Sequence, residues 1–174
     1  MKIVEEDYDR LENFKYISRW VNSPDTTLSS SALTQIRVLK PEKAAQIDEY
    51  LSPICGDKLY RYIFPVLKAE VSFDEFLDIR HLSNMDDAQN VRTWFLSLAI
   101  PSETMMVFLW EKYVAVETTW QVFVNYWDDF CYFGQDDIYI GAVDGPWYLL
   151  FFHEGHVVYG CIKENATISS KIKE

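Results

Sequence analysis

The last third of the chain constrains the fold most, because it holds three apolar segments separated by very short links. The segments are residues 137–143, 147–153 and 156–162. The links between them, Asp144-Gly145-Pro146 and Glu154-Gly155, have the composition of tight turns. A parallel crossover needs about a dozen residues, so strands joined by links this short are expected to pair antiparallel.

Upstream segments complete a predicted α+β domain. Residues 104–110 and 113–117 are joined by Glu111-Lys112 and predict a β-hairpin. Four helices are also predicted. The first begins at Pro41, and the third covers residues 86–99. The second and fourth begin at the capping boxes Ser72-x-x-Glu75 and Thr118-x-x-Gln121. The order is helices first and then β-β-α-β-β-β. We expect an antiparallel sheet of about five strands, with the helices packed mainly on one face.

Length and composition predict one folded domain over residues 1–174. The chain has 174 residues, 49% of them hydrophobic, which is enough to bury a core without disulfides or metals. Residues 1–34 are expected to form an N-terminal segment, in which 21–34 is a Ser/Thr-rich loop. The polar tail, residues 165–174, is expected to fray.

The charge balance restricts the class of partner. A total of 16 Lys and Arg residues against 27 Asp and Glu residues gives a formal net charge of −11. Nucleic acids bind proteins largely through phosphate neutralisation, and anionic lipids attract basic segments, so both are disfavoured as partners. A basic protein partner is compatible with this charge.

Signal and cysteine patterns predict a cytoplasmic protein. The N-terminal sequence MKIVEEDYDRLENF lacks the apolar region of a secretory signal. No run of about 18 consecutive apolar residues is present to span a membrane. The cysteines, Cys55, Cys131 and Cys161, are odd in number and widely spaced. They argue against a disulfide framework and favour a reducing compartment.

The strand, helix and meander region resembles one bacterial family. The residues that carry the resemblance are VETTWQVF at 116–123, YWDDF at 126–130, IYIG at 138–141 and Phe151-Phe152. This pattern is similar to that of short gammaproteobacterial proteins grouped as a domain of unknown function, and the likeness covers residues 114–160. That family carries no assigned catalytic residues, so the resemblance implies no site.

The chain also resembles, in general type, the immunity proteins of interbacterial toxin systems. These are commonly small, acidic, aromatic-rich α+β domains of the cytoplasm. The resemblance implies a non-enzymatic protein that binds and neutralises a cognate toxin domain, which is often a basic nuclease. We therefore expect a basic protein partner, no nucleic-acid or membrane partner, and no cofactor.

An acidic interface is predicted around the link between the fourth helix and the next strand. Four carboxylates bracket this link: Asp128, Asp129, Asp136 and Asp137. Acidic residues in such a position steer a basic partner during association, and the alternative is that they only keep the protein soluble. Tyr139 and Trp147 are expected to be exposed aromatic anchors beside these acids, with packing under the helices as the alternative.

Two alternative functions stay open from the sequence. One is a hydrolase, using Cys131 as a nucleophile beside an acid and a histidine, or a metal held at His153 and His156. The simpler interpretations are a small apolar residue at a helix end and two exposed hairpin histidines. The other alternative is a structural subunit of a homo-oligomer, and the oligomeric state stays open.

Overall fold

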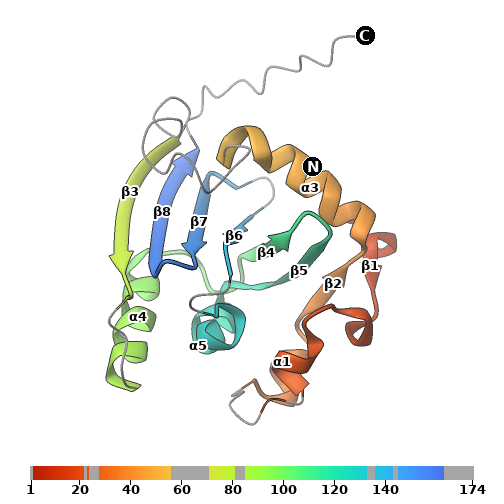
Figure 1. Cartoon of the computed structure of the whole chain (residues 1–174), viewed down its shortest axis with the longest axis horizontal. Helices are drawn as coiled ribbons and strands as arrows, with labels where there is room; N and C mark the ends of the chain where they lie inside the picture. The colour runs from red at the N-terminus through yellow and green to blue at the C-terminus, as the bar shows by residue number, and fades with distance from the viewer. Residues whose placement is uncertain are drawn as a thin grey trace.

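The structure is a computed structural model, and it describes residues 2–21, 23, 28–55, 71–80, 85–132, 136–142 and 145–162. The predicted tail at 165–174 lies outside these residues. The described part of the chain is an α+β fold built on one eight-stranded sheet, in which every pair of neighbouring strands is antiparallel (Figure 1).

Helices are interspersed among the strands of the described residues, and the last three elements, β6 to β8, are all strands. The strands are β1 (Tyr8–Asp9), β2 (Arg37–Leu39), β3 (Val71–Asp78), β4 (Met105–Glu111), β5 (Val114–Thr119), β6 (Ile138–Gly141), β7 (Trp147–Phe152) and β8 (His156–Ile162). The α-helices are α1 (Ile17–Val21), α2 (Ser30–Leu33), α3 (Pro41–Cys55), α4 (Met85–Ser97) and α5 (Trp120–Phe130), and two 3-10 helices are η1 (Glu5–Asp7) and η2 (Leu11–Asn13). No helix within the described residues combines the length and apolar character needed to cross a membrane.

The predicted hairpin and meander are confirmed at the centre of the sheet. The strand order is β1-β2-β5-β4-β6-β7-β8-β3, so β4 pairs with β5, and β6, β7 and β8 follow as neighbours. Gly155 occupies the turn between β7 and β8 with a φ of +87°. A Cβ at this position would lie 3.1 Å from Cα of Arg80. Glycine is therefore required there by both conformation and space.

The sheet formed by the described residues has eight strands, so the prediction of about five was wrong. The largest difference is at Ser72-x-x-Glu75, where the pattern predicted a helix and the chain forms β3. The register of β3 against β8 shifts between Phe73 and Glu75, as in a β-bulge. In the sequence, Phe73 and Phe76 are three residues apart, a spacing that also occurs on one helix face. The missed strands β1 and β2 are too short to show alternation.

Apolar side chains form a core on each face of the sheet. The larger core joins α1, α2, α4 and α5 to one face, through side chains such as Trp20, Phe95 and Phe123. The smaller core joins α3 to the opposite face, with Ile47 fully buried. Figure 1 shows α3 above the sheet and α1, α4 and α5 below it. Helices of the described part of the chain therefore cover both faces, four on one side and α3 on the other.

The predicted start of α5 is correct to within one residue. Thr119 is the N-cap, and its side chain accepts the backbone N–H of Val122 at 3.3 Å. Thr118, the predicted cap, is buried and donates its hydroxyl to the backbone oxygen of Gln35 at 3.0 Å. The Thr118 hydroxyl thus connects β5 to the segment before β2, and the Thr119 hydroxyl caps α5.

A kink in α5 is held by a side chain from α4. Tyr126 has non-helical backbone angles, with φ −130° and ψ 28°. Arg92 donates to the backbone oxygens of Val124 at 3.1 Å and Asn125 at 2.8 Å. These bonds satisfy carbonyl groups beside the break in the helix. The kink therefore has a defined partner, and it sets the direction of the last turn of α5.

Candidate functional site

The first two predicted carboxylates lie at the end of α5 in different environments. Asp128 is exposed, whereas Asp129 is only 5% exposed. The backbone oxygen of Asp129 accepts the indole N–H of Trp20 at 2.9 Å, which joins α1 to α5. Partial desolvation by neighbouring protein atoms raises the pKa of the Asp128 carboxyl above its ordinary value. Of this pair, Asp128 is the residue whose side chain faces solvent.

Asp136 is 7% exposed and forms an ion pair with Arg19 of α1. Nη1 of Arg19 donates to Oδ2 at 2.7 Å, and Nη2 donates to Oδ1 at 3.2 Å. The backbone N–H of Tyr132 also donates to Oδ2, at 3.3 Å. A two-point pair between guanidinium and carboxylate fixes orientation as well as distance. Asp136 therefore fastens α1 to the segment after α5.

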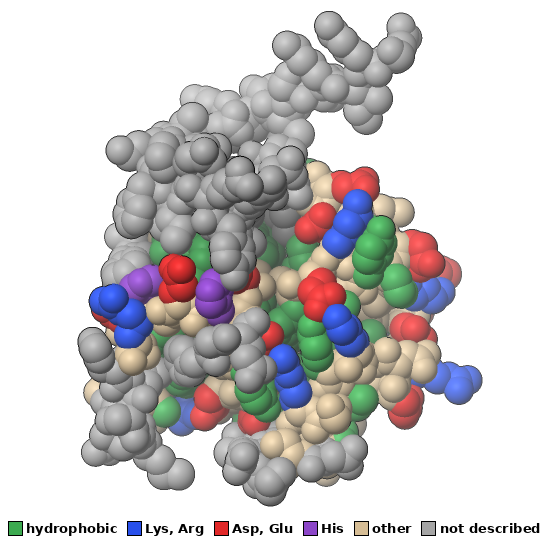
Figure 2. Space-filling view, viewed as in Figure 1, with side chains coloured by type: hydrophobic (Ala, Val, Ile, Leu, Met, Phe, Trp, Pro, Cys, Tyr) green, Lys and Arg blue, Asp and Glu red, His purple; other side chains and the backbone are tan. Residues whose placement is uncertain are grey.

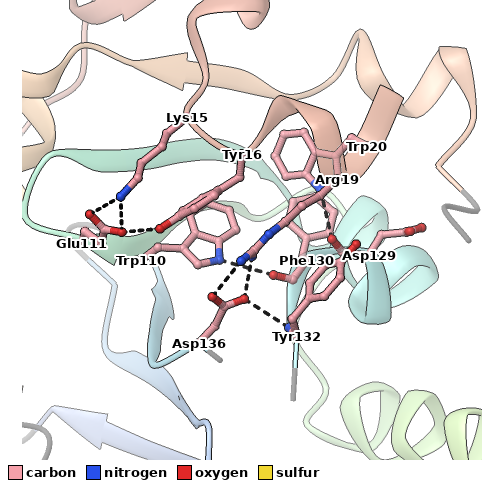
Figure 3. Close-up of polar contacts among 10 residues, drawn as sticks. All are labelled: Lys15, Tyr16, Arg19, Trp20, Trp110, Glu111, Asp129, Phe130, Tyr132 and Asp136. Carbon is pink, nitrogen blue, oxygen red and sulfur yellow. Dashed lines mark hydrogen bonds and ion pairs between the residues drawn. The ribbon is translucent and has the colours of Figure 1, made fainter. Parts of the chain in front are cut away.

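Aromatic and charged side chains surround this ion pair (Figure 3). The guanidinium of Arg19 lies over the ring of Tyr16 at 4.2 Å and over the ring of Tyr132 at 4.5 Å. Tyr16 donates its hydroxyl to Glu111 at the end of β4, which also accepts from Lys15 at 2.8 Å. We call these residues the Arg19 cluster: Tyr16, Arg19, Glu111, Tyr132 and Asp136.

Sequence reasoning found only one member of the Arg19 cluster, Asp136. Tyr16 and Arg19 fall in residues 1–34, which were interpreted as a segment and loop. Their spacing of three, with Tyr16 just before α1 and Arg19 within it, is the one local signal that could have grouped them. The pairing of Arg19 with Asp136 joins residues 117 apart in the sequence, so no local pattern predicts it.

Asp137 contacts the turn between β7 and β8. Its Oδ1 accepts the backbone N–H of His153 at 2.9 Å and lies 2.9 Å from Nδ1 of the same histidine. This hydrogen bond raises the pKa of His153 above its ordinary value, and the negative charges of Asp137 and Glu154 add to the effect. Asp137 therefore links the start of β6 to the neighbouring turn, as a structural contact.

The two predicted aromatic anchors are buried, so the expectation that they are exposed was wrong. Tyr139 is 3% exposed and belongs to the smaller core. Trp147 is 7% exposed, and its ring lies 5.8 Å from that of Trp120 in the larger core. Alternation correctly predicted a strand around Tyr139, but every residue of β6 is buried because helices and chain cover both faces of the sheet centre.

Cys131 lies in an environment that opposes nucleophilic chemistry. Its side chain is 1% exposed at the end of α5. Burial raises the pKa of the thiol well above its ordinary value, and the carboxylates of Asp136 and Asp128 raise it further. A reactive cysteine needs a lowered pKa and access to its substrate. The residue therefore fits the simpler interpretation of a small apolar side chain.

The two histidines flank the turn between β7 and β8. His156 pairs with Phe152 in the strand ladder, and His153 contacts Asp137. Both side chains are partly exposed. Within the described residues, no group of three or more His, Cys, Asp or Glu could hold a metal ion. The described residues around the pair thus do not bring three such ligands together, and a zinc site usually needs about four.

Exposed carboxylates are spread over several elements. Those that form no ion pair with another described residue include Glu12, Glu42, Glu103, Asp128 and Glu154. Other acids pair with bases, as in the contact between Lys15 and Glu111. Figure 2 shows acidic and basic side chains interspersed over one face of the molecule. The net negative charge therefore resides partly in exposed acids outside these ion pairs.

A comparison with protein families finds a match that is longer than the resemblance over residues 114–160. A search of curated proteins and a search of solved structures found no match. The family match begins at the first residue of β1 and ends within β8, so it includes the whole Arg19 cluster and the N-terminal half from residue 8 onward. Residues 8–160 match the family described as protein of unknown function (DUF2947), and the chain belongs to that family.

Proposed function

We propose that this chain is a non-enzymatic protein-binding module, and specifically an immunity protein that binds and neutralises a cognate basic toxin domain. The observation that carries the proposal is the set of exposed carboxylates that form no ion pair with another described residue, in a chain of net charge −11. Such a surface attracts a basic partner over several ångströms and repels nucleic acid. The proposal includes action in the cytoplasm and requires no cofactor.

Burial of most of the six predicted interface residues reduces the number of side chains that can contact a partner. We propose that Asp128 is its acidic residue, because it is the exposed one of the four carboxylates. Tyr16 and Tyr132 of the Arg19 cluster are partly exposed and are held by fixed contacts. Rigid Tyr side chains lose little entropy on binding and are enriched at protein interfaces. We therefore propose Tyr16 and Tyr132 as the aromatic contacts with the partner, in place of Tyr139 and Trp147.

Capture of the partner followed by a neutralisation assay tests this function. The tagged full-length chain is incubated with lysate of its source organism at low salt, and bound protein is eluted with high salt. The proposal expects one stoichiometric basic partner that is toxic when expressed alone and harmless when expressed with this chain. A partner that is not toxic, or no stoichiometric partner at all, contradicts it.

Two further outcomes of the same experiment would favour the alternatives. Stoichiometric metal or a bound small molecule in native mass spectrometry would favour the hydrolase. A stable homo-oligomer in sizing chromatography, without any captured protein, would favour the structural subunit. The proposed immunity function requires neither a bound metal or small molecule nor a homo-oligomer.

Single charge reversals locate the proposed surface better than removal of all four acids. Changing Asp136 or Asp137 would also break contacts within the fold. We expect Asp128→Lys to slow association with the captured partner and to weaken its salt dependence. Glu103→Lys is the matched control, since it makes the same charge change at an exposed residue near the opposite end of α5. Equal effects of the two variants would place the interface elsewhere.

A further inference from the structure

The contacts around Arg19 are those that a protein site for a guanidinium ion would make. A guanidinium is planar, so aromatic rings stack on it, and its two outer nitrogens match the two oxygens of a carboxylate. Tyr16 and Tyr132 supply the rings, and Figure 3 shows the Arg19 head between them. Asp136 supplies both carboxylate oxygens, at 2.7 Å and 3.2 Å.

The residues around the Arg19 head are also held by contacts that do not involve Arg19. The Tyr16 hydroxyl is bonded to Glu111, and its ring packs against Trp110 with the centroids 6.3 Å apart. Asp136 accepts the backbone N–H of Tyr132, and its own N–H donates to the Tyr132 oxygen at 3.2 Å. The Tyr16 ring, the Asp136 carboxylate and the Tyr132 backbone are therefore positioned by neighbours other than Arg19, as a preorganised ligand site requires.

We propose that Tyr16, Tyr132 and Asp136 form a guanidinium-binding site, and that Arg19 is its intramolecular ligand. The site keeps its shape when the Arg19 side chain is removed, and it then binds a small guanidinium ion from solution. In the intact chain, an arginine side chain from any other molecule enters only in exchange for Arg19. The site thus docks α1 on the segment after α5 by recognising a side chain.

Chemical complementation of Arg19→Ala in the full-length chain tests the proposal. Ethylguanidinium replaces most of the deleted side chain, and ethylammonium at the same concentration and ionic strength is the control. At about ten times its dissociation constant, ethylguanidinium should lower the unfolding equilibrium constant of the variant about tenfold. We expect ethylammonium to have no comparable effect, and the wild-type chain to respond to neither compound.

A second substitution separates binding in the site from a general solvent effect. Arg19→Ala combined with Asp136→Asn removes the charged acceptor, so ethylguanidinium should no longer stabilise the protein. The amide signals of Tyr132 and its neighbours should shift on titration of the single variant and stay unchanged in the double variant. Stabilisation by ethylammonium to the same degree, or by ethylguanidinium in the double variant, would overturn the proposal.

The test remains decisive if Arg19→Ala does not fold by itself. Ethylguanidinium should then restore the folded state, and failure to restore it contradicts the proposal. Arg19→Lys provides an independent comparison, since lysine keeps the positive charge but lacks the planar two-point donor. We expect Arg19→Lys to be less stable than the wild type. A lysine variant as stable as the wild type would show that charge alone is recognised.

Discussion

The strand β7 and the N-terminal segment 2–21 are held in the fold by different kinds of contact. Every residue of β7 is buried, and the strand pairs with β6 on one side and β8 on the other. The N-terminal segment contributes the two-residue strand β1 to the sheet and buries Phe14 and Trp20 in the larger core. It is also fastened by charged side chains, among them Arg19 to Asp136 and Lys43 to Asp7 at 3.0 Å. Strand pairing and apolar burial thus fix the sheet centre, whereas the N-terminal segment combines the burial of two aromatic side chains with a few charged contacts.

The largest effect is expected at the sheet centre. Phe151 is fully buried in the larger core, and Phe151→Ala removes its ring and leaves a cavity. We expect a loss of about 3–5 kcal/mol in the free energy of unfolding. Chemical denaturation measures this loss. A cost below about 1 kcal/mol would mean that the strand is not packed as described.

The next effect is expected where the N-terminal segment is attached. Asp136→Asn keeps the size of the side chain and removes its charge, so Arg19 loses its ionic partner. Because Arg19 is partly exposed, we expect a cost of about 2–3 kcal/mol, below that of a fully buried pair. Hydrogen exchange should increase around α1, where Trp20 bonds to the end of α5. If hydrogen exchange increases equally in β7, the N-terminal segment does not depend on this ion pair more than the sheet centre does.

A backbone effect of intermediate size is expected at the turn after β7. Gly155→Ala places a Cβ at a positive φ and against Arg80. We expect it to cost about 1–2 kcal/mol, because L-residues disfavour this backbone region. Glu154→Ala in the same turn is the control, and it should be nearly neutral since Glu154 is exposed. Denaturation of both variants measures the difference.

The smallest effect is a pH dependence at His153. Its pKa is raised in the folded protein by the hydrogen bond to Asp137, so the protonated form stabilises the fold. This stabilisation is fully present below the unfolded pKa of about 6.5 and is lost as the pH rises through the folded value. His153→Gln should therefore cost more at acidic than at alkaline pH, by less than about 1 kcal/mol because the pair is partly exposed. His156→Gln is the control, and an equal pH dependence in both variants would refute the assignment to His153.

The sequence predicted the sheet centre well because its signals are local. Three apolar segments with links of two or three residues leave few arrangements other than an antiparallel meander, and β6, β7 and β8 follow it. The capping pattern at Thr118 likewise placed α5 within one residue. The edges were missed for physical reasons. β1 and β2 are too short to alternate, and β3 carries Phe73 and Phe76 at a helix-like spacing of three, beside a register shift between Phe73 and Glu75.

The candidate site was predicted less well because it depends on contacts between distant residues. The four acids near the end of α5 look equivalent in the sequence, but one pairs with Arg19 and another with His153. No local pattern reveals a partner 117 residues away. Exposure of Tyr139 and Trp147 was also misjudged, since it depends on what covers each face of the sheet.

The proposed function assigns partner binding to Asp128 and the attachment of α1 to Asp136. A comparison of Asp128→Asn with Asp136→Asn tests this assignment most directly. Each variant removes one negative charge, and the unfolding free energy and the amount of captured partner at low salt are measured for both. We predict that Asp128→Asn keeps wild-type stability and captures less partner, whereas Asp136→Asn is destabilised. An Asp128→Asn variant that captures partner as the wild type does, or that is destabilised as much as Asp136→Asn, would contradict it.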